Sequence, residues 1–193
     1  MASGIIPRSD SGTDAYLDHP SSCDFLPDGM PDPQFSDDGV VDLHYFQFDG
    51  VCRIAKGSNS KILVLTFGGL RRLNSDGSID ATFGTAGLTI LPSDSRPEIL
   101  DVMEDGRFVV GGHTYLATNP PGKNRFVRLF RFWQDGKPDP RFGQNGRADI
   151  YAANDYLPGT LQIIHSKVFL AGYYGSFGSL DPFVTRVFGT RKL

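Results

Sequence analysis

The sequence predicts an all-β protein built from repeated units of short antiparallel strands. Three observations predict this fold class. A pattern of aspartate, glycine and phenylalanine occurs three times along the 193 residues. Short runs rich in β-branched and aromatic residues alternate with Gly-containing turn signals, and no stretch carries a helical period of useful length. A repeat at fixed spacing marks one structural unit per copy, so it takes precedence over other signals.

Each copy of the repeat motif begins with an Asp-Gly pair, followed by a second Asp, a Phe and a Gly. These follow the first Asp by four, seven and eleven residues. The copies are Asp28, Gly29, Asp32, Phe35 and Gly39; Asp76, Gly77, Asp80, Phe83 and Gly87; and Asp135, Gly136, Asp139, Phe142 and Gly146. The repetition indicates a structural role: turns, carboxylates that bond backbone, rings buried between units, and glycines where a strand enters. We expect each copy to join the last strand of one unit to the first strand of the next.

Between successive motif copies the sequence predicts about four short strands. The first unit is expected to place them at residues 45–48, 51–54, 61–67 and 70–73. The second unit repeats this order at 88–91, 98–102, 107–112 and 125–133, and the third at 148–151, 161–164, 167–172 and 183–188. Four antiparallel strands form a propeller blade, and a handful of blades closes into a ring.

Two basic positions recur in register and support this alignment. The third strands begin with Lys61, Arg107 and Lys167, and the fourth strands contain Arg72, Arg131 and Arg186. The arginines are separated by 131 − 72 = 59 and 186 − 131 = 55 residues, which defines the length of the unit.

The motif resembles the signature of the delta-60-repeat β-propeller family, R-x-N-x-D-G-S-x-D-x-x-F-G-x-x-G. The middle copy, residues 72–87, matches nearly throughout. The third copy departs by Trp133 and by Lys137-Pro138, and the first by Asp24 in place of the Arg and by Ser36 after the Phe. The resemblance covers about residues 24–188. It implies a propeller fold and no particular activity.

Three units are fewer than the four to eight blades of typical propellers. A three-unit array leaves two open faces with exposed apolar surface. We therefore expect a homodimer with a twofold axis and a six-bladed ring, in which the first motif bridges onto the third blade of the other copy. The alternatives are a fragment, or an open array capped by its arm. We divide the chain into a polar N-terminal arm, residues 1–22, and a repeat domain, residues 23–193.

Composition excludes several classes of function. The net charge of −3 argues against a nucleic-acid binder, so the basic, aromatic run at residues 125–133 is interpreted as a strand. No secretory signal and no apolar run of about 20 residues is visible, which predicts no membrane span and a cytoplasmic address by default, with export by another route left open. Cys23 and Cys52 are too few for a disulfide framework, and a single bridge between them stays open.

No metal, cofactor or catalytic site is predicted. The carboxylates of Asp28, Asp32, Asp37 and Asp38 raise a calcium hypothesis, but their spacing is not that of an EF-hand and the other copies lack the last two. Structural Asx turns account for them better. The four histidines are scattered, and neither a nucleophile elbow nor a P-loop is present.

Aromatic and amide side chains in the long loops are the candidate ligand-binding residues: Tyr115, Asn119, Tyr173, Tyr174 and Phe177. Such groups suit flat, hydroxyl-rich ligands such as sugars, and they also mark protein interfaces. The sequence therefore predicts a non-catalytic interaction or ligand-binding scaffold that self-associates. A carbohydrate-binding module is the alternative, and a hydrolase with paired acids of raised pKa in the channel is a weaker one.

Overall fold

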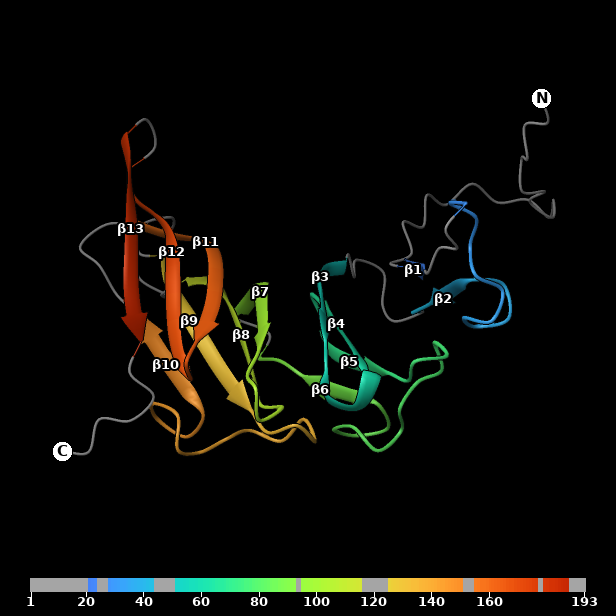
Figure 1. Ribbon diagram of the computed structural model, residues 1–193. Helices are drawn as coiled ribbons and strands as arrows, with labels where there is room; N and C mark the ends of the chain where they lie inside the picture. Colours follow the sequence, from blue (N-terminus) through green and yellow to red (C-terminus); the bar gives the residue numbers. More distant parts are fainter. Residues whose placement is uncertain are drawn as a thin grey trace, which may run out of the picture.

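The computed structural model describes residues 21–23, 28–43, 51–92, 95–115, 125–150, 155–176 and 179–187 (Figure 1). These residues form β-strands and turns, with one short 3-10 turn, η1 (Ser58–Ser60), and no α-helix within the described ranges. No helix there is long and apolar enough to cross a membrane. The prediction of an all-β, propeller-type array is confirmed.

Two four-stranded antiparallel meanders form the centre of the chain. The first sheet contains β3 (Val51–Lys56), β4 (Ile62–Thr66), β5 (Gly69–Leu73) and β6 (Leu88–Ile90). The second sheet contains β7 (Ser95–Val102), β8 (Phe108–Tyr115), β9 (Arg125–Phe132) and β10 (Arg147–Ile150). The expected strand at residues 45–48 lies outside the described residues.

The third sheet has three strands within the described residues, one fewer than expected. They are β11 (Asp155–Ile164), β12 (Lys167–Ser176) and β13 (Ser179–Val187), in that spatial order. The first strands of the second and third sheets share a bulge, between Pro97 and Ile99 and between Pro158 and Thr160. A proline is tolerated at such a bulge on an edge strand, because its missing N–H breaks no ladder bond.

The repeat motif connects the third and fourth strands of one sheet, so the expectation that it joins two blades is wrong. The strands on either side of the second copy, β5 and β6, pair directly, with Arg71 opposite Leu88. Those on either side of the third copy, β9 and β10, pair in the same way, with Phe130 opposite Arg147. The motif folds back on the strand before it: the Asp80 N–H donates to the Arg72 carbonyl at 2.9 Å. The crossover between sheets instead follows the fourth strand.

The first copy of the motif is flanked by a separate pair of short strands, β1 (Ser21–Cys23) and β2 (Val40–Asp42). Cys23 lies opposite Val40. These two residues lie five before and twelve after Asp28, the same offsets that place Arg71 and Leu88 around Asp76. By register, β1 and β2 therefore stand as the third and fourth strands of a blade whose first two strands are absent from the described residues.

The sheets stack as successive layers, with the β1–β2 pair at the far end from the third sheet (Figure 1). Three apolar clusters fill the interfaces. Each contains the phenylalanine of one motif copy and side chains of the sheet that follows it: Phe35 with the first sheet, Phe83 with the second and Phe142 with the third. Each motif thus belongs to one sheet and packs on the next, which sets the direction of the array.

Candidate functional site

The second copy of the motif holds a carboxylate between basic side chains. Asp80 is 5% exposed. Its Oδ2 accepts from Arg72 Nε at 2.9 Å and lies 3.0 Å from Lys61 Nζ, while its Oδ1 accepts from the Thr82 hydroxyl at 2.6 Å. The Thr82 hydroxyl, with the Lys61 ammonium and Arg72 guanidinium, holds the pKa of Asp80 far below its usual range, although burial opposes this shift.

The third copy repeats this arrangement in a more buried setting. Asp139 is fully buried, and its Oδ2 accepts from Arg131 Nε at 3.0 Å and from Arg107 Nη1 at 3.2 Å. Its Oδ1 accepts from the Arg141 backbone N–H at 3.1 Å. Burial alone would raise the pKa of Asp139, but the Arg141 N–H and the Arg131 guanidinium lower it below its usual value.

A cation-π contact lies beside each of these ion pairs. The Arg72 guanidinium carbon is 4.8 Å from the centre of the Phe83 ring, and that of Arg131 is 4.8 Å from the centre of the Phe142 ring. Each arginine therefore joins the motif carboxylate to the ring that packs on the next sheet.

Successive motif copies are also linked by backbone. The Ser36 N–H donates to the Asp76 carbonyl at 2.8 Å, and the Gly84 N–H donates to the Asp135 carbonyl at 2.8 Å. The glycine after each accepting aspartate has φ near +85° and lies against the preceding copy. A Cβ on Gly136 would lie 2.4 Å from Thr89 Oγ1. Glycine is required here by both the positive φ and the close approach.

The first copy of the motif lacks both the basic side chains around its second aspartate and a neighbouring motif against its glycine, within the described residues. Asp32 is half-buried, and its Oδ1 accepts the Gln34 N–H at 2.9 Å. No ion pair to Asp32 forms among the described residues. A Cβ built on Gly29 meets nothing within 4 Å. In the part of the chain that the structure describes, the first copy therefore presents a carboxylate without an ion pair and a glycine without a neighbouring motif, whereas in the other two copies both positions have partners.

The outer face of the third sheet is the apolar end of the array. Cross-strand partners share a face, so this face carries Phe169 with Arg186, Ala171 with Val184, and Tyr173 with Pro182. Val184 is 76% exposed, whereas Leu70 and Leu129, in the same register of the first and second sheets, are fully buried. The third sheet thus exposes the surface that its neighbours bury against a following blade.

The opposite end of the array is also open. Ile54 on β3 is 53% exposed, whereas Leu161, in the same register of the third sheet, is 6% exposed. The first copy of the motif covers part of this end through Phe35, which packs with Val64 and Leu73.

The structure does not gather the predicted ligand-binding residues into one site. Tyr173 is half exposed and Tyr174 half-buried, and as neighbours on β12 they face opposite sides of the sheet. The backbone of Tyr115 ends β8, but its side chain and all of Asn119 and Phe177 lie outside the described residues. The side chains of Cys23 and Cys52 also lie outside them.

The acidic loop of the first copy contains Asx turns. Asp28, Asp32 and Asp38 each accept the backbone N–H two residues ahead, at 3.0, 2.9 and 2.9 Å. Within the described part of the chain, no group of three or more His, Cys, Asp or Glu side chains could hold a metal ion.

The aspartates with shifted pKa values give no support to the hydrolase alternative. Asp76, Asp80, Asp105, Asp135 and Asp139 all have pKa values below the usual one. A catalytic general acid needs a shift in the opposite direction.

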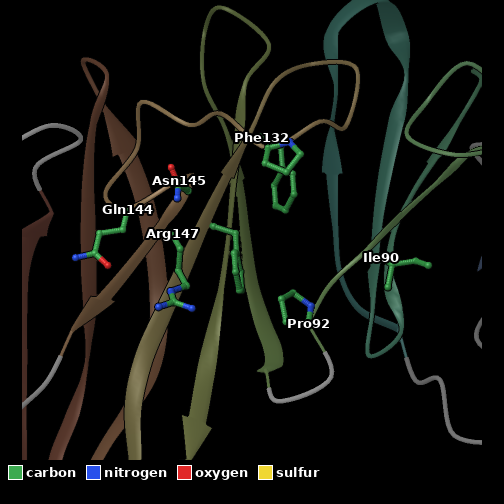
Figure 2. Close-up of a pocket in the computed structure, with 9 residues that line it drawn as sticks. Ile90, Pro92, Phe132, Gln144, Asn145 and Arg147 are labelled. Atoms are coloured by element: carbon green, nitrogen blue, oxygen red, sulfur yellow. The ribbon is translucent and has the colours of Figure 1, made fainter.

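A pocket of about 400 Å³ lies between the first and second sheets, and sequence reasoning did not identify it. Figure 2 shows Ile90 and Pro92 on one side and the side chains of Gln144, Asn145 and Arg147 on the other. Phe130, Phe132, Pro138 and Gly146 complete the lining. No carboxylate or nucleophile is among these residues, so the pocket offers contacts for binding and no acid–base pair. Its two sides come from different units, and no local sequence signal marks such a pair.

The family described as "Domain of unknown function (DUF5122) beta-propeller" matches residues 58–83, which contain β4, β5 and the second motif copy through Phe83. No curated protein and no solved structure matches the chain. The match supports a β-propeller repeat family for this sequence.

Proposed function

We propose that this chain is a non-catalytic β-propeller scaffold that self-associates, with two copies building one ring of six blades. The proposal rests on one observation: both ends of the array are incomplete blades among the described residues, and a strand present at one end is of the kind missing at the other. In the described part of the chain, one end has a sheet of three strands, and the other has a motif between a third and a fourth strand, β1 and β2, without the first two strands of a blade. The second of these strands, β2, can supply the fourth strand that the three-stranded sheet lacks.

The exposed surfaces support association in energetic terms. Val184 and Ile54 lie at opposite ends, and both are more than half exposed in registers that are otherwise covered by a neighbouring sheet. Burying large apolar side chains stabilises an interface by roughly 1.5–3 kcal/mol each. Two copies related by a twofold axis bury both ends twice, because each junction joins the third sheet of one copy to the first sheet of the other.

The mass in solution tests this proposal. We expect light scattering at micromolar concentration to give twice the 21.1 kDa of one chain. Val184→Glu places a charge on the open face and should shift the protein to the monomer. Ile79→Glu is the matched control, since Ile79 is 47% exposed and lies in the second motif copy, away from the outer faces of the first and third sheets. A wild-type protein that stays monomeric at these concentrations would overturn the proposal.

Carbohydrate binding is the second candidate function. It is favoured by one observation, the half-exposed ring of Tyr173, because exposed aromatic rings stack on sugar faces. A glycan array probed with the wild type and with Tyr173→Ala tests it: binding that the substitution abolishes would support a lectin-like module.

A further inference from the structure

The proposed self-association leaves open how the two chains join, and this inference rests on it. We propose that β2 of one copy adds to the free edge of β13 in the other as the fourth strand of the third sheet. The Asp32 carboxylate of the added segment then lies between Arg186 and Lys167. In the separate chain, β1 occupies the edge of β2 and must be displaced.

The arginine of β13 stands in the register that holds a motif carboxylate elsewhere. Arg72 lies opposite Leu63, Arg131 opposite Val109, and Arg186 opposite Phe169. Each of these opposing residues comes two positions after the basic residue that precedes or opens its strand, Lys61, Arg107 or Lys167. In the first and second sheets, these two basic side chains converge on Asp80 and Asp139. The third sheet thus carries the same two basic residues in the same registers, and Arg186 also has an interaction within its own chain.

The first copy of the motif supplies that carboxylate and a strand of matching register. Arg71 pairs with Leu88, and Phe130 with Arg147. Carried over by register, Thr185 pairs with Val40 of the partner subunit. Val184 then lies opposite Val41 of the partner subunit, which covers the most exposed apolar side chain of the open face. Asp32 has no ion pair among the described residues of its own chain. Its negative charge is complementary to the positive charges of Arg186 and Lys167 in the other copy.

The backbone contact between successive motifs extends across the same junction. The bonds from Ser36 N–H to the Asp76 carbonyl and from Gly84 N–H to the Asp135 carbonyl are each 2.8 Å. The next N–H in this series is that of Gly143, which donates to no carbonyl within the described residues. The partner's Asp28 would provide the acceptor. Its neighbour Gly29, with nothing within 4 Å of a built Cβ, would then receive the third motif as Gly136 receives the second.

In the separate chain, the short strand β1 occupies the edge of β2 that we assign to β13 of the partner, and we call this its placeholder role. It pairs with β2 in the register that we assign to β13, with Cys23 opposite Val40. It is three residues long, whereas β13 has nine. In sequence it is followed by Asp24, where the repeat has Arg72, Arg131 and Arg186 in its other copies. Exchange of β1 for β13 would bring two basic side chains, Arg186 and Lys167, to the Asp32 carboxylate.

A charge-swap experiment tests the pairing between chains. Asp32→Arg and Arg186→Asp each place like charges at both junctions of a symmetric dimer, and each variant alone should dissociate at least about a hundredfold more readily. Mixing the two variants restores an opposite-charge pair at both junctions, so sedimentation should show a heterodimer of near wild-type affinity. Restoration requires contact between chains, since a contact within one chain gains nothing from mixing.

The outcomes separate this inference from the proposed function. A wild-type dimer that neither substitution weakens, or that mixing fails to restore, overturns the strand addition and leaves self-association standing. A monomeric wild type overturns both. Folding of each variant is checked by circular dichroism and thermal unfolding, and Asp38→Arg, an exposed change in the same loop, serves as the control for added charge.

Displacement of β1 has a test of its own in the full-length chain. Ser22→Pro removes the N–H at the centre of β1 and weakens its pairing with β2, where Ser22 lies opposite Val41. If β1 blocks the edge, the dissociation constant of the dimer should fall by about tenfold, because a larger fraction of chains is competent to join. Ser22→Ala is the matched control. An unchanged or higher dissociation constant for Ser22→Pro would overturn the placeholder role.

Discussion

Replacing Asp139 by Asn should be the most destabilising change of a single carboxylate in this molecule. The side chain is fully buried and accepts from Arg131 Nε at 3.0 Å and Arg107 Nη1 at 3.2 Å. Asparagine keeps the shape and one acceptor oxygen but removes the charge. It leaves the Arg131 guanidinium, whose side chain is 9% exposed, without its counter-ion. Removing one partner of a buried ion pair costs about 3–5 kcal/mol.

The lower part of that range applies here. Arg107 retains a second carboxylate, because its Nη2 lies 2.5 Å from Asp105 Oδ2, and Arg131 retains its contact with the Phe142 ring. We therefore expect a loss of about 3 kcal/mol in the free energy of unfolding, which lowers Tm by about 6–12 °C for a chain of this length. Urea unfolding followed by circular dichroism measures the change, with the slope m unchanged.

Asp135→Asn in the same motif is the matched control. Asp135 is 45% exposed, and its Oδ1 accepts the Lys137 N–H at 3.0 Å, an acceptor that asparagine retains. The expected cost is below about 1 kcal/mol. Equal losses for the two variants, or a loss for Asp139→Asn within about 0.5 kcal/mol of zero, would refute the argument that the buried ion pair stabilises the corner.

Three further predictions concern other parts of the molecule. The pKa of Asp80 is lower in the folded than in the unfolded protein, so its stabilisation is complete above about pH 4 and is lost as the pH falls further. The stability difference between wild type and Asp80→Asn, measured by urea unfolding, should therefore shrink from pH 5 towards pH 2, and a constant difference would contradict this. Phe83→Ala should cost about 3–5 kcal/mol because the ring is fully buried between two sheets, whereas Phe83→Leu should cost clearly less. In the Val184→Glu background, where the proposed dimer is weakened, Tyr173→Ala should change the free energy of unfolding by less than about 0.5 kcal/mol, because the ring is half exposed; a larger loss would indicate that the ring packs within its own chain.

The repeat motif predicted the all-β content and the three larger sheets, because its spacing is set by local turn chemistry. Asp-Gly pairs demand tight turns wherever they occur, and the runs between them have the composition of strands. The same local signals could not tell whether the motif returns to its own sheet or crosses to the next. That choice depends on the pairing of Arg71 with Leu88, a contact across the motif that no single residue encodes.

The sites at the ends of the array were predictable only in part. The recurrence of Arg72, Arg131 and Arg186 is visible in sequence, but the contacts of Arg72 with Asp80 and of Arg131 with Asp139 appear only in the structure. The sequence predicts Tyr173 and Tyr174 in a loop after a strand that ends at residue 172, but β12 continues to Ser176 and contains both. On a strand, neighbours face opposite sides.

The matching backbone hydrogen bonds between successive motif copies affect how such a protein can gain or lose units during evolution. Each corner recognises the next through a main-chain N–H and a main-chain carbonyl, and neither group depends on the side chains that distinguish one unit from another. A whole unit can therefore be duplicated or deleted in one event, and the new junction forms with the same geometry as the old. The number of units in this architecture is therefore open to stepwise genetic change, one unit at a time.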